Sequence, residues 1–278
     1  TLSSSSAASD VYKRQFLQQS GAGEITVATK MGRRAEQLPE NYTMENFRAW
    51  TERSRRLLAQ DTLDLVQLHC PPSAVIDDDA TYDALDQLVS EGVIAAYGVS
   101  VETMDQAMSA LRRPNLTNLQ IIFNPFRLKP LDEVLPIAAE KGVGVFARVP
   151  LASGLLSGKY TAETTFDKDD HRTYNRNGEA FDKGETFSGV PFAEGVAAAD
   201  KLKASLPDGV TLPAATLAWI ASREGVTSVI PGARSAEQAT ANAGAADLLD
   251  GGFDLEAFDA LVRDVYDRRL RAEIHPQW

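Results

Sequence analysis

Short apolar runs alternate with longer amphipathic stretches along most of the chain. Six of these runs are rich in β-branched residues, end at glycine, proline or polar positions and are too short for helices, so they predict strands. The runs span residues 24–30, 64–69, 93–100, 116–123, 143–148 and 226–230. Apolar residues recur at helical spacing over residues 42–60, 78–91, 102–112, 130–141, 192–204, 212–223, 235–246 and 255–271. Because helical stretches separate the strands, right-handed βαβ crossovers and a parallel α/β sheet are predicted.

The run over residues 64–69 ends on His69 and is stopped by Pro71 and Pro72. A parallel strand that delivers a polar side chain at its C-terminal end is how a β/α barrel builds an active site. His69 is therefore the first candidate for chemistry, with a satisfied core histidine as the alternative. The pattern leaves open whether the sheet is a closed barrel or an open one.

Five other polar or charged residues lie at or near the C-terminal ends of predicted strands. They are Lys30, Ser100, Gln120, Asn124 and Arg148. In a parallel sheet these ends share one rim, so we expect the side chains to gather there. We predict no metal site, because the three histidines lack metal-ligand spacing and there are no paired cysteines. The absence of a Gly-x-Ser-x-Gly elbow argues against a Ser/His/Asp hydrolase.

Two stretches fall outside the alternating pattern. Residues 162–191 are polar, glycine-rich and aperiodic, and a connection of this length usually forms a functional lid or a binding loop. Residues 274–278 either line a pocket or form a solvent-exposed end.

Composition excludes several classes of protein. With 278 residues, 44% hydrophobic and 24% charged, the chain is long enough for one large α/β domain. No apolar run approaches the roughly 18 residues of a membrane span. The single cysteine, Cys70, favours a reducing cytoplasm. A net charge of -11 argues against nucleic-acid and anionic-membrane partners, which bind basic patches. Oligomeric state does not follow from the sequence.

The first fifteen residues do not continue the pattern. Residues 3–9 are of low complexity and residues 10–15 have no periodicity. Residues 5–15 also resemble one translated frame of a sequencing-library adapter. We therefore expect residues 1–15 to be a non-native leader, with a disordered native tail as the alternative, and residues 16–278 to be a single, partial domain.

Several motifs, in order along the chain, resemble the aldo-keto reductases. They are Thr29-Lys30, the segment from Leu68 to Pro71, the segment from Tyr97 to Ser100, Gln120 with Asn124, residues 150–160, and the segment from Ile230 to Ser235 with Gln238 and Asn242. The resemblance extends from Phe16 to about Ala246. It implies a (β/α)8 TIM barrel that lacks about its first two βα units. The implied activity is hydride transfer from NADPH to an aldehyde or ketone, and the alternative is a non-catalytic NADPH-binding regulatory subunit.

The resemblance also implies roles for individual residues. Lys30 matches the lysine that supports a catalytic tyrosine, and His69 matches the histidine that orients the substrate carbonyl. The implied NADP(H)-binding residues are Ser100, Gln120, Arg148, Gly154, Leu156, Gly158, Lys159, Gly232, Arg234, Ser235, Gln238 and Asn242. A neighbouring ammonium stabilises a phenolate, which fits the role of Lys30. Arg234 and Ser235 at a helix N-terminus suit a 2′-phosphate and favour NADPH. We expect residues 162–191 to close over this cofactor.

The chain departs from the family pattern at several points. No residue matches the catalytic aspartate and tyrosine that precede the lysine strand, and we reject Tyr12 because it stands too close to that strand. Val101 replaces an asparagine that binds the carboxamide in many members, and Arg148 replaces a stacking tyrosine. We therefore expect this chain by itself to be inactive, with six strands and unpaired sheet edges.

Overall fold

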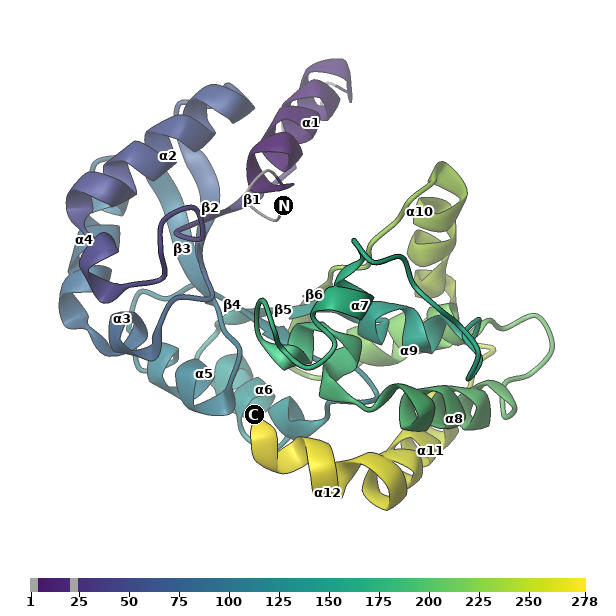
Figure 1. Ribbon diagram of the computed structural model, residues 1–278. Coiled ribbons are helices and arrows are strands. Elements are labelled where there is room, and N and C mark those ends of the chain that lie inside the picture. Colours follow the sequence, from purple (N-terminus) through teal and green to yellow (C-terminus); the bar gives the residue numbers. More distant parts are fainter. Residues whose placement is uncertain (1–4, 21–24) are drawn as a thin grey trace. The chain divides into compact units, whose positions relative to one another are not determined.

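The computed structural model describes residues 5–20 and 25–278 (Figure 1). The chain divides into two compact units, residues 1–120 with 141–143 and residues 121–140 with 144–278. The strand order is β1-β2-β3-β4-β5-β6, and the ladders described below are parallel. The six predicted strands and their parallel arrangement are confirmed.

Among the residues that the structure describes, the first unit carries the first three strands, the beginning of the fourth and five helices. The strands are β1 Ala28–Met31, β2 Leu63–His69, β3 Ile94–Ser100 and β4 Asn118–Ile122, of which the last two residues belong to the second unit. The helices are α1 Ser5–Ser20, α2 Met44–Leu58, α3 Ser73–Asp77, α4 Asp79–Ser90 and α5 Met104–Ala110, with a 3-10 turn η2 at Pro39–Asn41. In Figure 1, α2 and α4 lie along the strands of this unit. The helix α3 is absent from the sequence-based prediction.

Local sequence explains where these helices begin and end. Thr43 caps α2 by accepting a hydrogen bond from the backbone N–H of Asn46, and Ala59 ends the helix in the left-handed region at φ 56°. Thr103 and Gln106 form a capping box at the start of α5. The caps at Thr43 and Thr103 fix where α2 and α5 begin, after the loops that follow β1 and β3.

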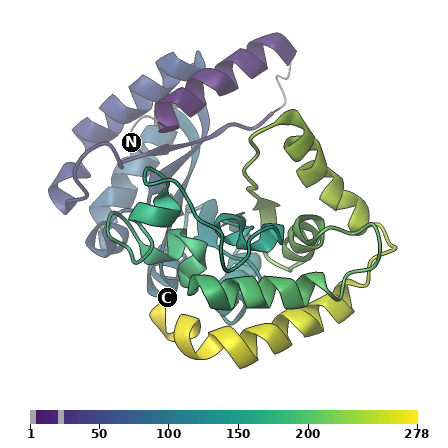
Figure 2. The same cartoon turned by 45° about the vertical axis from the view of Figure 1, so that its right-hand side comes forward.

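The second unit carries the last strands and the long loop. Its strands are β5 Gly144–Arg148 and β6 Val226–Val229. Its helices are α6 Val134–Glu140, α7 His171–Tyr174, α8 Phe192–Lys203, α9 Leu212–Ala221, α10 Ala236–Ala243, α11 Leu255–Val265 and α12 Arg271–Ile274. Short 3-10 turns are η3 Lys129–Leu131, η4 Ala152–Ser157, η5 Lys183–Glu185, η6 Phe187–Gly189, η7 Gly244–Leu248 and η9 His275–Gln277. Figure 2 shows α8, in green, beside α11, in yellow.

Two predicted elements need correction. The helix expected over residues 255–271 ends at Val265, and a π-helical turn, η8 Tyr266–Leu270, joins it to α12. Both Tyr266 and Leu270 are buried, so the π-helical turn keeps its apolar side chains on the core. The spacing of apolar residues therefore does not reveal where the α-helix ends. The strand predicted over residues 24–30 spans Ala28–Met31, and residue 24 lies outside the described residues.

The loop over residues 162–191 is more ordered than its aperiodic sequence predicts. It contains α7, η5 and η6, and Thr186, Phe187 and Ser188 are each at most 1% exposed. The end of the chain is also packed, since Ile274 is 1% and Trp278 is 7% exposed. The solvent-exposed alternative for residues 274–278 is therefore wrong for these two side chains.

The predicted leader is helical in this structure, because α1 covers Ser5–Ser20. Asp10 on this helix is buried and accepts hydrogen bonds from Thr29 Oγ1 at 2.9 Å and Ser54 Oγ at 3.3 Å. Helical backbone does not test where this sequence comes from, so the boundary at residue 16 stays a prediction. None of the helices in the described part of the chain is long and apolar enough to cross a bilayer.

Candidate functional site

Parallel register aligns the polar ends of three strands in the first unit. His69 on β2 pairs with Ser100 on β3, and Ser100 pairs with Gln120 on β4. Paired residues in a sheet point to the same face, as do residues two apart on one strand. The predicted candidates His69, Ser100 and Gln120 therefore form one row, which we call the rim row.

A second row lies two residues earlier on the same face. Lys30 on β1 pairs with Gln67, Gln67 with Gly98, and Gly98 with Asn118. We call this set the inner row. It places the half-buried Lys30 one step below the rim row, on the face that carries His69. Gln67 and Asn118 were missed in the sequence, although each stands two residues before a predicted candidate.

Buried amides connect the two rows. Gln67 Nε2 donates a hydrogen bond to Asn118 Oδ1, and Gln120 Nε2 donates to Gln67 Oε1 at 3.1 Å. Gln67 is 1% exposed, and Asn118 and Gln120 are each 3% exposed. Each hydrogen bond therefore replaces one that the amide would otherwise make with water. The network fixes the amide of Gln120 in one orientation.

Gly98 gives Asn118 its place in the inner row. A Cβ at position 98 would lie 2.5 Å from the carbonyl oxygen of Asn118 and 2.8 Å from its Cβ. Real Cβ atoms do not approach backbone this closely, so the row requires glycine at this position.

His69 has a cationic neighbour that the sequence did not reveal. Arg33 Nη1 lies 3.5 Å from His69 Nε2, and Arg33 Nη2 lies 3.9 Å from Glu102 Oε1. Arg33 comes from the turn after β1, and Glu102 follows β3. The charged groups around His69 thus come from loops far apart in sequence.

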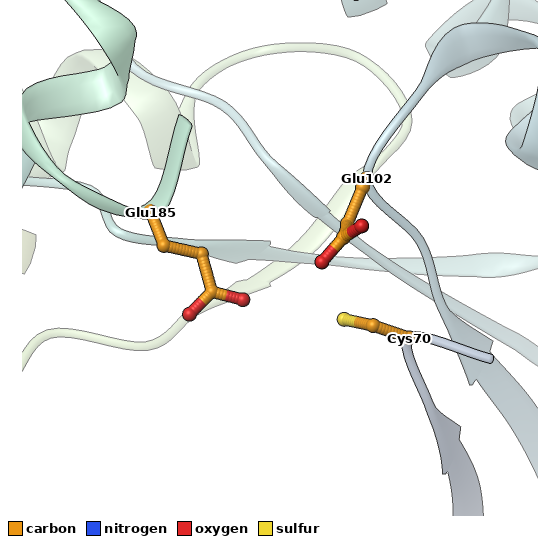
Figure 3. Close-up of side chains that lie close together, drawn as sticks. All are labelled: Cys70, Glu102 and Glu185. Atoms are coloured by element: carbon orange, nitrogen blue, oxygen red, sulfur yellow. The ribbon is translucent and has the colours of Figure 1, made fainter. Parts of the chain in front are cut away.

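Ser100 is buried at the rim and contacts the single cysteine. Cys70 Sγ lies 3.4 Å from Ser100 Oγ, and the backbone N–H of Cys70 donates to Ser100 O at 3.0 Å. Cys70 adopts a left-handed backbone at φ 50°, which turns the chain at the end of β2. Figure 3 shows Cys70 and Glu102 after their strands, and also draws Glu185 of the second unit.

In the second unit, Arg148 at the end of β5 forms an ion pair with Glu185. Arg148 Nη1 lies 3.4 Å from Glu185 Oε1, and the two side chains are 12% and 16% exposed. Glu185 belongs to η5 in the long loop. The predicted cofactor contact of Arg148 therefore involves a guanidinium that also holds this loop.

Further hydrogen bonds dock the same loop within the second unit. Ser153 Oγ donates to Glu185 O at 3.0 Å and accepts from the N–H of Phe187 at 3.1 Å. Asn124 Nδ2 donates to Ser188 Oγ at 2.7 Å and to Val149 O at 2.9 Å. Asn124, predicted as a strand-end candidate, is thus a structural amide.

The segment that carries the predicted cofactor-binding residues Gly154, Leu156, Gly158 and Lys159 forms η4 and the turn after it. A Cβ at Gly154, where φ is 97°, would lie 2.2 Å from Tyr160 Oη. The N–H groups of Gly154, Leu156 and Gly158 all donate to carbonyl oxygens of the same segment. Leu156 is fully buried, whereas Lys159 is exposed. Any contact of this segment with an anion is therefore best made by the ammonium of Lys159.

The start of α10 carries the remaining predicted residues. Ser235 Oγ accepts from the N–H of Gln238 at 3.3 Å, Gln238 Oε1 accepts from the N–H of Arg234 at 2.7 Å, and Asn242 Nδ2 donates to Gly232 O at 3.1 Å. These bonds fold the segment before α10 back onto the helix. A Cβ at Gly232 would meet nothing within 4 Å, so the segment has open space beside it. The exposed Arg234 and the helix N-terminus together favour an anion there.

Comparison with known proteins identifies related chains. The model of the Aldo/keto reductase family matches residues 9–258, and the match begins inside the predicted leader. The uncharacterized oxidoreductase YqkF of Bacillus subtilis is 28% identical over 229 residues, which are 80% of this chain and 69% of that protein. The uncharacterized oxidoreductase Rv2298 of Mycobacterium tuberculosis is 33% identical over 199 residues. That match covers 70% of this chain but only 57% of Rv2298. A probable voltage-gated potassium channel subunit beta of Oryza sativa is 27% identical over 244 residues, 81% of this chain and 69% of that subunit.

Solved structures of aldo-keto reductases also superpose on this chain. The glycerol dehydrogenase AKR11B4 of Gluconobacter oxydans superposes with a TM-score of 0.72 at 26% identity, covering 98% of this chain and 81% of that chain. The holo form of the aldo-keto reductase AKR11C1 of Bacillus halodurans gives 0.71 at 25% identity, covering 93% and 78%. A Klebsiella pneumoniae aldo-keto reductase in complex with NADPH shares the fold, with a TM-score of 0.64 at 20% identity, covering 95% and 79%. The predicted α/β class of TIM-barrel type is confirmed, and the chain belongs to the aldo/keto reductase family.

Proposed function

We propose that the protein is an oxidoreductase that reduces aldehydes or ketones to alcohols by transferring a hydride from NADPH. The observation that carries this proposal is the pair of adjacent rows on one sheet face, with Lys30 in the inner row and His69 in the rim row. Carbonyl reduction builds negative charge on oxygen, and preorganised donors and cations at the strand ends stabilise that charge.

The residues at the start of α10 fit the cofactor. Bound NADPH supplies the hydride. Arg234 and Ser235 would hold its 2′-phosphate at the helix N-terminus, and Gln238 and Asn242 would face the adenosine. In the first unit, Ser100 and Gln120 would bind the nicotinamide carboxamide, with Gln120 held in orientation by Gln67. Arg148 and Lys159 are the proposed cationic contacts for the rest of the cofactor.

We propose further that this chain by itself does not turn over a carbonyl substrate. The proton donor expected beside Lys30 is a tyrosine, and Tyr12, the tyrosine that precedes it, is 69% exposed. A longer form of the protein would supply the missing tyrosine and aspartate. The single cysteine supports a reducing, cytoplasmic site of action for that form.

A regulatory NADPH-binding subunit is the second candidate. The observation in its favour is the match to a probable potassium channel beta subunit of Oryza sativa, and a similar match to one of Arabidopsis thaliana at 29% identity. Such a protein would bind NADPH through the same residues and would reduce carbonyls slowly or not at all.

The test is to compare the 278-residue chain with a longer form that includes the natural codons upstream of Phe16. NADPH binding is followed by quenching of protein fluorescence, and turnover by oxidation of NADPH with 4-nitrobenzaldehyde. We expect binding by both forms and turnover by the longer form alone. Tight binding without turnover by the longer form supports the regulatory candidate, and absence of NADPH binding by both forms contradicts both candidates.

A further inference from the structure

Tyr160 closes the segment that carries part of the proposed cofactor site. Its hydroxyl donates a hydrogen bond to the carbonyl oxygen of Ser153 at 3.3 Å, which ties the end of the segment back to η4. The same hydroxyl lies beside Gly154, where an added Cβ would collide with it. Lys159, one of the proposed cationic contacts for the cofactor, immediately precedes the tyrosine. The backbone from which Lys159 extends therefore depends on where Tyr160 lies.

Arg172, on α7 of the long loop, holds this tyrosine. Its Nη1 donates a hydrogen bond to Tyr160 Oη. Its Cζ lies 4.4 Å from the centroid of the Phe166 ring, and Phe166 packs edge-on against Tyr160 with the ring centroids 5.2 Å apart. The side chain of Arg172 is only 13% exposed. The long loop and the segment that ends at Tyr160 thus meet through a hydrogen bond and a packed aromatic ring.

Asp170 fixes the guanidinium of Arg172 in one orientation. Arg172 Nε donates to Asp170 Oδ1 at 2.8 Å and Arg172 Nη2 donates to Asp170 Oδ2, so the planar fork meets both carboxylate oxygens. Asp170 Oδ1 also accepts from the backbone N–H of Arg172 at 2.9 Å. The hydrogen bonds from Arg172 lower the pKa of Asp170, so the carboxylate is ionised at neutral pH. Each of the three guanidinium nitrogens already has a protein acceptor, which favours a positioning role over direct contact with the cofactor.

We propose that Arg172 is a positioning residue for the cofactor segment, residues 153–160. It acts through the hydroxyl of Tyr160 and joins the long loop to this segment before the cofactor binds, which lowers the cost of ordering the site. The inference rests on the proposed binding of NADPH for its consequence. The segment is proposed to meet the part that NADPH and NADH share. Loss of Arg172 therefore weakens both cofactors alike, whereas loss of Arg234 weakens NADPH alone.

The positioning is tested first on the 278-residue chain without cofactor. Trypsin cleaves after lysine, and Lys159 is exposed, so cleavage between Lys159 and Tyr160 reports release of the tyrosine. In Arg172→Gln and in Tyr160→Phe, mass analysis of the products should show this cleavage to be about fivefold faster or more, as expected for the loss of one hydrogen bond. Lys168→Gln removes a cation from an exposed position of the same loop and should leave the rate unchanged. Equal rates in the parent and Arg172→Gln overturn the proposal.

A double-mutant cycle on NADPH binding separates action through Tyr160 from direct contact with the cofactor. Fluorescence titration gives dissociation constants for the parent, Arg172→Gln, Tyr160→Phe and the double variant. Each single change should weaken binding about fivefold, and the double variant should bind no more weakly than Arg172→Gln, because both changes remove the same hydrogen bond. Effects that multiply in the double variant would indicate direct contact of Arg172 with the cofactor and would overturn the proposal.

Two further comparisons distinguish geometry from charge. In Arg172→Gln the affinities for NADPH and NADH should fall by factors that agree within about twofold, and a loss confined to NADPH overturns the proposal. Arg172→Lys keeps the cation but loses the planar fork that pairs with Asp170, so it should weaken binding as Arg172→Gln does, and parent-like affinity overturns the proposal. If no form of the protein binds NADPH, the proposed function fails, and cleavage after Lys159 still decides whether Arg172 holds the segment.

Discussion

Gln120 Nε2 donates a hydrogen bond to Gln67 Oε1 at 3.1 Å, which joins the rim row to the inner row. Gln67 in turn donates to Asn118, so a single amide connects two strands of the sheet. Both groups are nearly inaccessible to water. Gln120 is the residue proposed to bind the nicotinamide carboxamide. Its orientation therefore depends on Gln67, which lies in the inner row and not at the rim.

Replacing Gln67 by leucine should destabilise the protein. Asn118 Oδ1 and Gln120 Nε2 would both lose a partner in a buried place, and an unsatisfied buried polar group costs about 1–3 kcal/mol. Urea denaturation measures the loss. The exposed Gln87→Leu is the matched control and should stay within about 0.5 kcal/mol of the parent. Equal stability of the two variants would show that the amide network does not support the fold.

Gly98→Ala tests the close approach between β3 and β4. Its methyl group would lie 2.5 Å from the backbone oxygen of Asn118, which cannot move aside without disturbing the ladder. We expect a loss of about 1–3 kcal/mol in unfolding free energy, the range for overpacking. Gly244→Ala is the control, because its nearest neighbour is 3.9 Å away and its φ is -63°. A Gly98→Ala protein as stable as Gly244→Ala would contradict the packing argument.

Much of this site could be predicted from the sequence, because its residues lie at the ends of strands that the local pattern predicts. His69, Ser100 and Gln120 end predicted strands, and parallel strands bring such ends to one rim. Side chains two residues apart on a strand lie on the same face, so the sequence also predicts that Gln67 lies on the face of His69. That part of the site follows from strand assignment alone.

The missing parts depend on contacts between distant segments. Arg33 and His69 are 36 positions apart, and no spacing rule links a turn to a strand end that comes after a helix. The ion pair between Arg148 and Glu185 likewise depends on how the long loop folds back. Neither the polar composition of that loop nor its lack of periodicity reveals that Phe187 is buried.

The last residue of the chain should hold the long loop in place. Trp278 Nε1 donates to Asp182 Oδ2 at 3.2 Å, and Arg127 Cζ lies 4.0 Å from the centroid of the indole ring. The ring also fills the space beside Gly189, where a Cβ would lie 2.2 Å from it. Trp278→Ala should cost on the order of 3 kcal/mol and expose residues 182–189 to trypsin and chymotrypsin.

A smaller aromatic ring at the same position keeps part of the packing. Trp278→Phe loses the bond to Asp182 and part of the ring that lies beside Gly189, so it should cost less than Trp278→Ala, about 1–2 kcal/mol, and expose the loop less. Cleavage rates are compared by limited proteolysis and intact-mass analysis. Equal cleavage rates in the parent protein and in Trp278→Ala would mean that the loop is held by other contacts.

Stability should fall as the pH is lowered through the histidine range. Burial, reinforced by the charge of Arg271, lowers the pKa of His275, and burial also lowers the pKa of His171. The unfolded chain then takes up protons at higher pH than the folded chain, so stability is full above about pH 6.5 and is lost as the pH falls below it.

Urea midpoints at pH 7.5 and 5.5 measure this loss. His275→Gln should reduce the difference between the two midpoints, because glutamine does not titrate and its amide can replace the bond from His275 Nε2 to Asp132. A smaller difference should remain because of His171. If His275→Gln shows the same difference as the parent, His275 does not contribute to the pH dependence.

Arg234→Gln should change the choice of cofactor. The 2′-phosphate is the group that distinguishes NADPH from NADH, and Arg234 is the exposed guanidinium at the start of α10. Loss of a charged hydrogen bond costs about 1.5–3 kcal/mol, which is roughly a tenfold to hundredfold weaker Kd for NADPH. Affinity for NADH, which lacks this phosphate, should stay within about twofold.

Fluorescence titration of the printed chain and of the longer form measures both constants. Arg56→Gln removes the same charge from an exposed position on α2 and corrects for the general effect of net charge on an anionic ligand. The binding of NADPH to Arg234→Gln should also depend less steeply on salt, because one of the proposed cationic contacts is lost. A parallel weakening of NADPH and NADH would place Arg234 at the pyrophosphate instead, and unchanged binding of both would remove it from the cofactor site.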